Sequence, residues 1–321
     1  MTTMIIGAGL VGSQIAHILV ERGERPVLMD FSPQPDALAE IVDLSRTTLI
    51  EGDVLKPFTI SQALLQHGVT SIVHTAANPL LTLGAQRDPW SAIQLNIVGT
   101  VNVLEAARVH GVKRVVVSSS NVLNHFLAGG EGKGNSADEE AYPRPTTFYS
   151  ATKQTIESIG LNYARWCNVD FAAMRYGAVF GPWSGRGGGG PSNIVRGALE
   201  VALSGDEAAV PSNSMEWVYS KDAAMGTVLA LDAKDLGSRV FNITMGCVVG
   251  PEEFAAALSA SIPGAKMRRG TPAASAVSMP DMQCVSDLTR ARTILGYSPR
   301  FGMTEAMRDM ANWLRSRASA R

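Results

Sequence analysis

The chain has 321 residues, which is enough for two domains or for one large α/β domain with a smaller lobe. Hydrophobic residues make up 45% of it and charged residues 18%, which excludes a disordered chain, and no apolar run is long enough to span a membrane. The 28 Lys and Arg residues are balanced by 29 Asp and Glu residues, so no cationic field attracts phosphate backbones, and we expect no nucleic-acid partner.

Short apolar runs alternate with segments of helical period in the first half of the chain. The runs are continuously apolar, which is typical of parallel strands buried on both faces of a sheet. This order predicts βαβ units and therefore an α/β fold, a doubly wound parallel sheet of the Rossmann type. The expected strands are Met4–Ile6, Arg25–Met29, Ser71–His74, Arg114–Val117 and Val169–Met174, and the expected helices are Gly12–Arg22, Trp90–His110 and Tyr149–Trp166.

A glycine-rich segment, residues 182–192 with the sequence PWSGRGGGGPS, interrupts this pattern and predicts a loop. After it we expect helices at 193–204, 222–231, 252–261 and 303–317, and strands at 217–219 and 240–243. Residues 1–179 are therefore expected to form mainly the Rossmann domain. Residues 180–321 are expected to form mainly a smaller substrate-binding lobe, with segments that return to the main sheet.

The cysteines and the first residues carry no special signal. Cys167, Cys247 and Cys284 are odd in number and widely separated, so we expect buried or half-buried thiols, with neither disulfides nor a metal site. The N-terminal segment lacks a basic stretch and a cleavage site and leads directly into an apolar strand, which predicts a cytoplasmic protein.

The first expected strand ends in a glycine motif, Gly7-Ala8-Gly9-Leu10-Val11-Gly12. Its glycines permit a tight turn and let a pyrophosphate approach the backbone at the N-terminus of the following helix. The next strand ends at Asp30, where a carboxylate accepts hydrogen bonds from the adenosine ribose and repels a 2′-phosphate. Phe31 and Ser32 follow, with no arginine, so the sequence predicts NAD rather than NADP as the cofactor.

Two further strand ends fit the same nucleotide crevice. Asp53 and Val54 follow a third apolar stretch, where the carboxylate either meets the adenine amino group or only caps a turn. Ala76 and Ala77 follow the strand that ends at His74, and their small side chains leave room for a dinucleotide. His74 itself is expected to be a packed core residue.

Tyr149 and Lys153 lie four residues apart and therefore on one face of a helix. A nearby ammonium group favours the phenolate, so we expect a lowered tyrosine pKa and a usable base. Ser118-Ser119-Ser120 ends a central strand, which is where doubly wound folds bind ligands. The plain alternatives are a capped turn for the serines and a solvated helix face for Tyr149 and Lys153.

Together these residues resemble the extended short-chain dehydrogenases/reductases, also called the NAD-dependent epimerase/dehydratase family. The segments that carry the resemblance, in order, are GAGLVGS, Asp30, GDV, HTAA, NIVGTVNVLEAAR, VKRVVVSSS, PTTFYSATK, MRYGAVFGPW, EWVYSKDAAMGTVLAL, FNIT and TRARTILGYSPRFGMTEAMRDMANWLR. The resemblance implies catalytic roles for Ser120, with Ser119 left open, and for Tyr149 and Lys153. It also implies cofactor contacts from Asn96 and Tyr176 and a homodimer formed through helices 90–110 and 149–166.

Two departures from the family pattern bear on the substrate. The glycine spacing differs from the usual TGxxGxxG, without loss of the expected dinucleotide binding. Ala178 stands where nucleotide-sugar enzymes of the family commonly have an asparagine that contacts the substrate diphosphate, which argues against a UDP-sugar. The arginines that could still bind phosphates are Arg186, Arg196, Arg239, Arg268 and Arg269.

Three functions are compatible with these residues. The leading hypothesis is an NAD-dependent dehydrogenase that acts on a small, carbohydrate-like secondary alcohol or carbonyl, with contacts from residues 80–87, the glycine loop and the smaller lobe. The alternative is a nucleotide-sugar epimerase or dehydratase with tightly bound NAD, which returns the cofactor unchanged. A non-catalytic dinucleotide sensor is the third, and Ser120, Tyr149 and Lys153 together argue against it. Net NADH production separates the first two.

Overall fold

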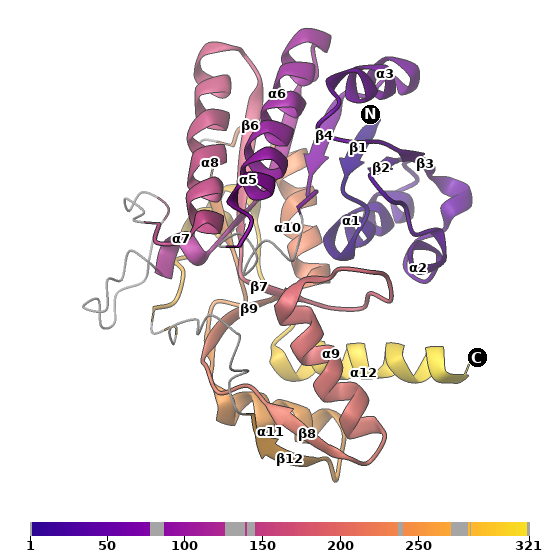
Figure 1. The fold of residues 1–321 in the computed structure, drawn as a ribbon, viewed down its shortest axis with the longest axis vertical. Coiled ribbons are helices and arrows are strands. Elements are labelled where there is room, and N and C mark those ends of the chain that lie inside the picture. The colour runs from indigo at the N-terminus through magenta and orange to yellow at the C-terminus, as the bar shows by residue number, and fades with distance from the viewer. Residues whose placement is uncertain are drawn as a thin grey trace.

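The computed structural model describes residues 2–77, 87–125, 139, 145–236, 240–270, 282 and 284–319. A seven-stranded sheet of order β10-β6-β5-β4-β1-β2-β3 forms its centre, and all neighbouring strands in it are parallel (Figure 1). Its strands are β1 (Thr3–Ile6), β2 (Val27–Asp30), β3 (Thr48–Glu51), β4 (Ser71–His74), β5 (Arg114–Ser120), β6 (Asp170–Tyr176) and β10 (Val240–Ile243). The strand order reverses between β1 and β4, where open α/β sheets bind ligands. The predicted doubly wound parallel sheet is confirmed.

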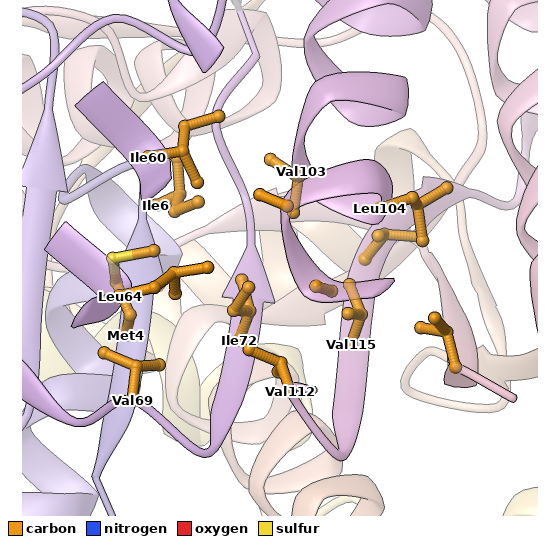
Figure 2. Close-up of a cluster of buried hydrophobic side chains, with 14 of the residues drawn as sticks. Met4, Ile6, Ile60, Leu64, Val69, Ile72, Val103, Leu104, Val112 and Val115 are labelled. Atoms are coloured by element: carbon orange, nitrogen blue, oxygen red, sulfur yellow. The ribbon is translucent and has the colours of Figure 1, made fainter. Parts of the chain in front are cut away.

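Helices cover both faces of this sheet. The helices on one face are α3 (Pro57–His67), α6 (Gly99–His110) and α8 (Phe148–Trp166), and those on the other are α1 (Leu10–Glu21) and α10 (Ser220–Asp232). Successive strand residues point to opposite faces, so Met4 and Ile6 pack towards α3 and α6, whereas Ile5 packs towards α1. Figure 2 shows side chains of α3 and α6 meeting those of β1, β4 and β5 in the first of these layers. Burial on both faces explains why the strands read as continuous apolar runs.

The C-terminal part of the chain builds a second core below the carboxyl ends of the main strands (Figure 1). Its edge-to-face contact between Phe180 and Trp217, with ring centroids 5.5 Å apart, joins two strands of a small sheet of order β11-β9-β7. A second small sheet pairs β12 with β8. The elements are β7 (Ala178–Phe180), α9 (Gly189–Leu203), β8 (Glu207–Val210), β9 (Met215–Tyr219), β11 (Val248–Val249), α11 (Pro251–Ser261), β12 (Lys266–Arg269) and α12 (Met303–Ser319).

Two segments of this part lie in or against the main sheet. Strand β10 pairs with β6 in parallel, and α10 packs on α1, where Arg22 and Asp232 form an ion pair of 2.6 Å. Short elements complete the described chain: α2 (Pro35–Ala39), α5 (Pro89–Ala92), α7 (Val122–His125), a 3-10 turn at Leu44–Arg46 and π-helical turns at Ile93–Val98 and Ala291–Leu295. Among the described residues we find no helix with the length and apolar character needed to cross a bilayer.

Three local expectations are corrected. Helix 90–110 is interrupted by the π-helical turn Ile93–Val98, and α9 begins at Gly189, inside the glycine run expected to be a loop. Cys247 is exposed rather than buried, whereas Cys284 is buried and Cys167 half-buried.

Candidate active site

The β1–α1 turn contains three glycines with different environments. Gly7 has φ +99°, and a Cβ there would lie 2.5 Å from the backbone nitrogen of Ala76. A Cβ on Gly12 would lie 2.0 Å from the carbonyl oxygen of Gly7. A Cβ on Gly9 would meet no atom within 4 Å. Gly7 and Gly12 are therefore required by the fold, whereas Gly9 leaves open space next to the start of α1.

The open space at Gly9 lies at a helix N-terminus that no side chain caps. Gly9 is the N-cap residue of α1 and has no side chain that could accept a hydrogen bond from the first turn. The N–H groups of that turn therefore have no side-chain cap and can bind an anion. Leu10 and Val11 contribute the backbone of this turn while their side chains pack into the core against the sheet. The arrangement suits a pyrophosphate.

Asp30 lies at the carboxyl end of β2, beside this turn. Its Oδ2 accepts the N–H of Ala8 at 2.9 Å and its Oδ1 accepts the N–H of Ser32 at 2.9 Å. Each carboxylate oxygen retains a lone pair for a further donor. The Arg186 guanidinium donates to Ser32 Oγ at 2.8 Å, so an arginine lies beside the Asp30 loop although it comes 154 residues after Ser32 in the chain.

The other predicted strand-end residues have mixed environments. Asp53 Oδ1 accepts the N–H of Leu55 at 2.9 Å, so the turn role is observed, and its second oxygen accepts no hydrogen bond from the described residues. Val54 is buried, and its carbonyl accepts Asn102 Nδ2 at 2.8 Å. Ala76 is half-buried and Ala77 exposed where the chain leaves β4. The two alanines are thus partly or fully exposed, whereas Val54 packs in the core.

Ser120, Tyr149 and Lys153 come together at the carboxyl end of β5. Ser120 is the last residue of that strand, and its hydroxyl lies near enough to the Tyr149 phenol, in the first turn of α8, to influence the pKa of that phenol. Lys153 Nζ lies 5.7 Å from the centroid of the Tyr149 ring and donates to the carbonyl oxygen of Ser118 at 2.8 Å. Its ammonium group has further hydrogens for a second partner. The hydroxyls and the ammonium of this group could hydrogen-bond a reacting substrate oxygen and the hydroxyls of a nucleotide ribose.

The pKa shifts in this group follow from burial. Burial raises the pKa of the Tyr149 phenol, and the hydrogen bond with Ser120 acts in the opposite direction. Burial lowers the pKa of Lys153 to about 8, against the nearby Glu157 carboxylate, which raises it. The expectation that Tyr149 has a lowered pKa is therefore wrong, because desolvation outweighs the lowering effect of the Ser120 hydroxyl.

Ser119 has a different role from Ser120. Its hydroxyl donates to Glu157 Oε1 at 2.5 Å, on the α8 side of the strand. The Arg175 guanidinium binds both oxygens of Glu157, at 2.9 and 2.8 Å, and donates to Asn124 Oδ1 at 3.0 Å. Sequence reasoning missed Glu157, although its position four residues after Lys153 puts it on the same helix face.

Asn96 and Tyr176 are both buried but differ in their hydrogen-bond partners. Asn96 is buried in the π-helical turn, its Nδ2 donates to Thr152 Oγ1 at 3.0 Å, and its Oδ1 has no partner among the described residues. Tyr176 is also buried, but its hydroxyl bonds Thr227 on α10. The structure therefore does not bring the Tyr176 phenol to Tyr149. Only its backbone stays beside the serine strand, where its carbonyl accepts the N–H of Asn121 at 2.9 Å.

The arginines considered as phosphate ligands have other partners where they are described. Arg268 lies 3.9 Å from Glu207, and Arg269 pairs with Glu252 at 2.5 Å on the exposed strand β12. Arg196 donates to the Trp183 carbonyl at 3.3 Å. Arg239 and residues 80–86 lie outside the described residues.

A parallel sheet with an open glycine turn, an acid after β2 and a serine, tyrosine and lysine group defines the class of nucleotide-dependent oxidoreductase folds. A model of the NAD dependent epimerase/dehydratase family matches residues 3–244. The UDP-glucose 4-epimerase of Corynebacterium glutamicum is 28% identical over 253 residues, which cover 75% of this chain and 74% of that protein. Sterol demethylase protein B of Methylococcus capsulatus is 31% identical over 255 residues, covering 78% and 72%.

Solved structures agree with this assignment. The holo form of a GalE-like L-threonine dehydrogenase from Cupriavidus necator superimposes with a TM-score of 0.82 at 25% identity, covering 98% of this chain and all of that one. The chain therefore belongs to the NAD-dependent epimerase/dehydratase family, and it is an NAD-dependent enzyme of the extended short-chain dehydrogenase/reductase type.

The residues present fit NAD. The free backbone N–H groups at Gly9 match a pyrophosphate, and Asp30 retains acceptors for ribose hydroxyls. Asn96 Oδ1, a buried acceptor without a partner among the described residues, is a further group that a bound ligand can satisfy.

Proposed function

We propose that the protein transfers a hydride between the carbon of a secondary alcohol or carbonyl and NAD, with Ser120, Tyr149 and Lys153 as its catalytic residues. The grouping of Ser120, Tyr149 and the buried Lys153, whose Nζ lies 5.7 Å from the Tyr149 ring centroid, is the observation that carries this proposal. When bound, NAD supplies the hydride acceptor. Tyr149 exchanges the proton of the reacting hydroxyl, and Ser120 holds the reacting oxygen by a hydrogen bond.

Lys153 has two tasks in this proposal. Its ammonium charge favours the phenolate form of Tyr149, and its remaining hydrogens bind the hydroxyls of the nicotinamide ribose. The bond to the Ser118 carbonyl fixes the direction of the side chain. The proposed cofactor contacts come from Gly7, Gly9, Leu10, Val11, Gly12, Asp30, Asp53, Val54, Ala76, Ala77, Asn96, Tyr149, Lys153 and Tyr176, the last through its backbone.

The proposed substrate is a small hydroxylated compound of carbohydrate type, such as a free sugar or sugar acid. Ala178 begins β7 next to the site and offers no donor to a diphosphate. Of the candidate arginines, Arg196, Arg268 and Arg269 each contact a carbonyl or carboxylate of the protein. A buried phosphate oxygen without its donor costs about 1–3 kcal/mol, so a substrate without phosphates is favoured.

A nucleotide-sugar epimerase is the second candidate, and the 28% identity to a UDP-glucose 4-epimerase supports it. An epimerase performs the same hydride step twice and returns NAD unchanged. Dehydrogenase and epimerase therefore differ in net NADH and not in the catalytic group.

We also propose that residues 180–321 bind the substrate, that the enzyme works in the cytoplasm and that it forms a homodimer through α5, α6 and α8. Large apolar side chains on these helices support the dimer, because Trp90 is 69%, Leu161 38% and Trp166 72% exposed. The three helices lie side by side on one face (Figure 1).

The test measures NADH formation across sugars, sugar acids, polyols and nucleotide sugars. We expect net NADH from a small hydroxylated compound, and UDP-glucose and UDP-galactose neither interconvert nor bind tightly. Tyr149→Phe keeps the ring but removes the proton-transfer group, so turnover falls about 100-fold or more while NAD binding is retained. Interconversion of the two nucleotide sugars without net NADH would establish the epimerase instead.

A further inference from the structure

The segment between β7 and α9 folds against the loop that follows β2, and we call residues 183–188 the strap. In Figure 1 this segment extends from the lower part of the molecule towards α2. The backbone N–H of Arg186 donates to Gln34 Oε1 at 2.5 Å, and Gln34 Nε2 donates back to the Arg186 carbonyl at 3.4 Å. Trp183 Nε1 also donates to that carbonyl, at 3.2 Å. The strap is therefore tied to the loop that follows β2.

The strap is anchored at its first residue, Trp183, by apolar packing. Trp183 is only 2% exposed and packs with Leu10 of α1 and Leu38 of α2 in one apolar cluster. The backbone of Arg186 is thus held from both sides, by Gln34 and by Trp183. Its position beside the β2 loop follows from this packing and does not depend on the exposed guanidinium.

The Arg186 side chain places a positive charge close to Asp30 without neutralising it. Its Nη2 donates to Ser32 Oγ at 2.8 Å, and the N–H of the same serine donates to Asp30 Oδ1 at 2.9 Å. Within the part of the chain that the structure describes, Arg186 has no ion pair with a carboxylate. The guanidinium is exposed, and among the described residues its hydrogen bond is to the neutral Ser32 hydroxyl, so its charge is available to an anionic ligand.

We propose that Arg186 and the Ser32 hydroxyl form a phosphate-accepting half of the adenosine-ribose subsite. A guanidinium next to a hydroxyl supplies the charge-assisted hydrogen bonds that a 2′-phosphate requires. Asp30 repels such a phosphate from the same ribose. Discrimination between NAD and NADP then depends on the Asp30 charge alone, because the cationic partner for NADP is already in place. This proposal rests on the cofactor assignment and is independent of the substrate.

The experiment compares dissociation constants of NAD and NADP by titration calorimetry, with no substrate present. The variants are Asp30→Asn, Arg186→Gln and the two combined, and Arg315→Gln on the exposed face of α12 is the control. Asp30→Asn is expected to tighten NADP binding about tenfold or more. In the double variant, Arg186→Gln is expected to remove this gain in NADP affinity, while the affinity for NAD changes much less. The control Arg315→Gln is expected to change the affinity for neither cofactor.

A second probe keeps the proposal testable if Asp30→Asn unfolds. Adenosine 2′,5′-bisphosphate and AMP are titrated into the wild-type protein and Arg186→Gln, in which Asp30 is intact. The bisphosphate is expected to lose about tenfold in affinity and AMP little. Equal losses for both ligands, or no loss for the bisphosphate, would overturn the phosphate role of Arg186. Failure of the wild-type protein to bind any of these ligands would instead reject the cofactor assignment itself.

Discussion

Ser119 and Ser120 are neighbours in β5, but their hydroxyls bond different partners. The Ser120 hydroxyl accepts the N–H of Val122 at 3.3 Å and lies near the Tyr149 phenol, whereas Ser119 is one of the donors to the buried Glu157 carboxylate. We expect Ser120→Ala to lower turnover by about 100-fold with the free energy of unfolding little changed. Ser119→Ala leaves Glu157 short of one donor, so it is expected to lower the free energy of unfolding by about 1–3 kcal/mol and turnover far less.

Steady-state kinetics and urea unfolding of the two variants check this pair of predictions. The variants are matched because both replace a buried serine in the same strand. A larger loss of turnover in Ser119→Ala than in Ser120→Ala would show that Ser119, and not Ser120, is the catalytic serine.

His74 makes stability depend on pH. Burial and the charge of Lys153 lower its pKa from 6.5 to about 3. Above pH 6.5 the imidazole is neutral in the folded and the unfolded chain. Below it the unfolded chain takes up a proton that the folded chain binds only near pH 3, so the free energy of unfolding falls as the pH falls, by about 2 kcal/mol at pH 5 from this residue.

The measurement is urea unfolding at pH 7.5 and pH 5 for the wild type, His74→Gln and the exposed-site control His17→Gln. His74→Gln is expected to lose less stability between the two pH values, whereas His17→Gln is expected to behave as the wild type. An unchanged pH dependence in His74→Gln would contradict the assignment.

At the scale of elements, two glycines of the β1–α1 turn have different roles, Gly12 in folding and Gly9 in binding. Gly12→Ala places a Cβ against the Gly7 carbonyl, so we expect a clearly lower melting temperature. Gly9→Ala meets no protein atom, so we expect a nearly unchanged melting temperature and weaker NAD binding, because the methyl group fills space next to the helix N-terminus. Thermal melts and NAD titrations distinguish the two. A Gly9→Ala variant with wild-type affinity would show that the pyrophosphate binds elsewhere.

The elements predicted from the sequence are those with strong hydrophobic periodicity. The predicted Val240–Ile243 strand agrees with β10 in both bounds, and Tyr149–Trp166 differs from α8 by one residue. The short strands β8 and β12 were missed because exposed Glu207 and the charged run Lys266–Arg269 resemble a surface loop. The π-helical turn in 90–110 carries no periodicity signal, since its apolar residues still recur at helical spacing.

The candidate site was predictable where its residues follow strands or share a helix face. Asp30 and the Tyr149–Lys153 pair are local patterns of this kind. Glu157 was missed as a site residue, and Arg186 was considered only as a ligand of a substrate phosphate and not as a neighbour of Asp30. Glu157 shares a helix face with Lys153, but its partners Ser119 and Arg175 come from other elements and are found only in the folded chain. Arg186 follows Ser32 by 154 residues, so its place beside the Asp30 loop is also found only there.

At the scale of the whole molecule, the exposed apolar side chains on α5, α6 and α8 predict self-association. Leu161→Arg is expected to convert a dimer to a monomer, because a buried interface would enclose an unpaired charge. Val201→Arg on α9 is the matched control, since Val201 is 37% exposed and Leu161 38%, and it is expected to leave the mass unchanged. Light scattering after size-exclusion chromatography measures the mass. A monomeric mass for the wild-type protein would contradict the proposed dimer.

The return of β10 and α10 to the main sheet has a consequence for protein synthesis. Ile15 and Leu19 of α1 are covered by Ala224 and Val228 of α10, and the outer edge of β6 is paired only by β10. A ribosome makes β1 to β6 long before residue 243 emerges, so the nascent chain presents an apolar helix face and an unpaired strand edge throughout that interval. The N-terminal half therefore depends on the C-terminal half to complete folding. Stalled translation before β10 is expected to yield an aggregation-prone chain rather than a folded nucleotide-binding unit.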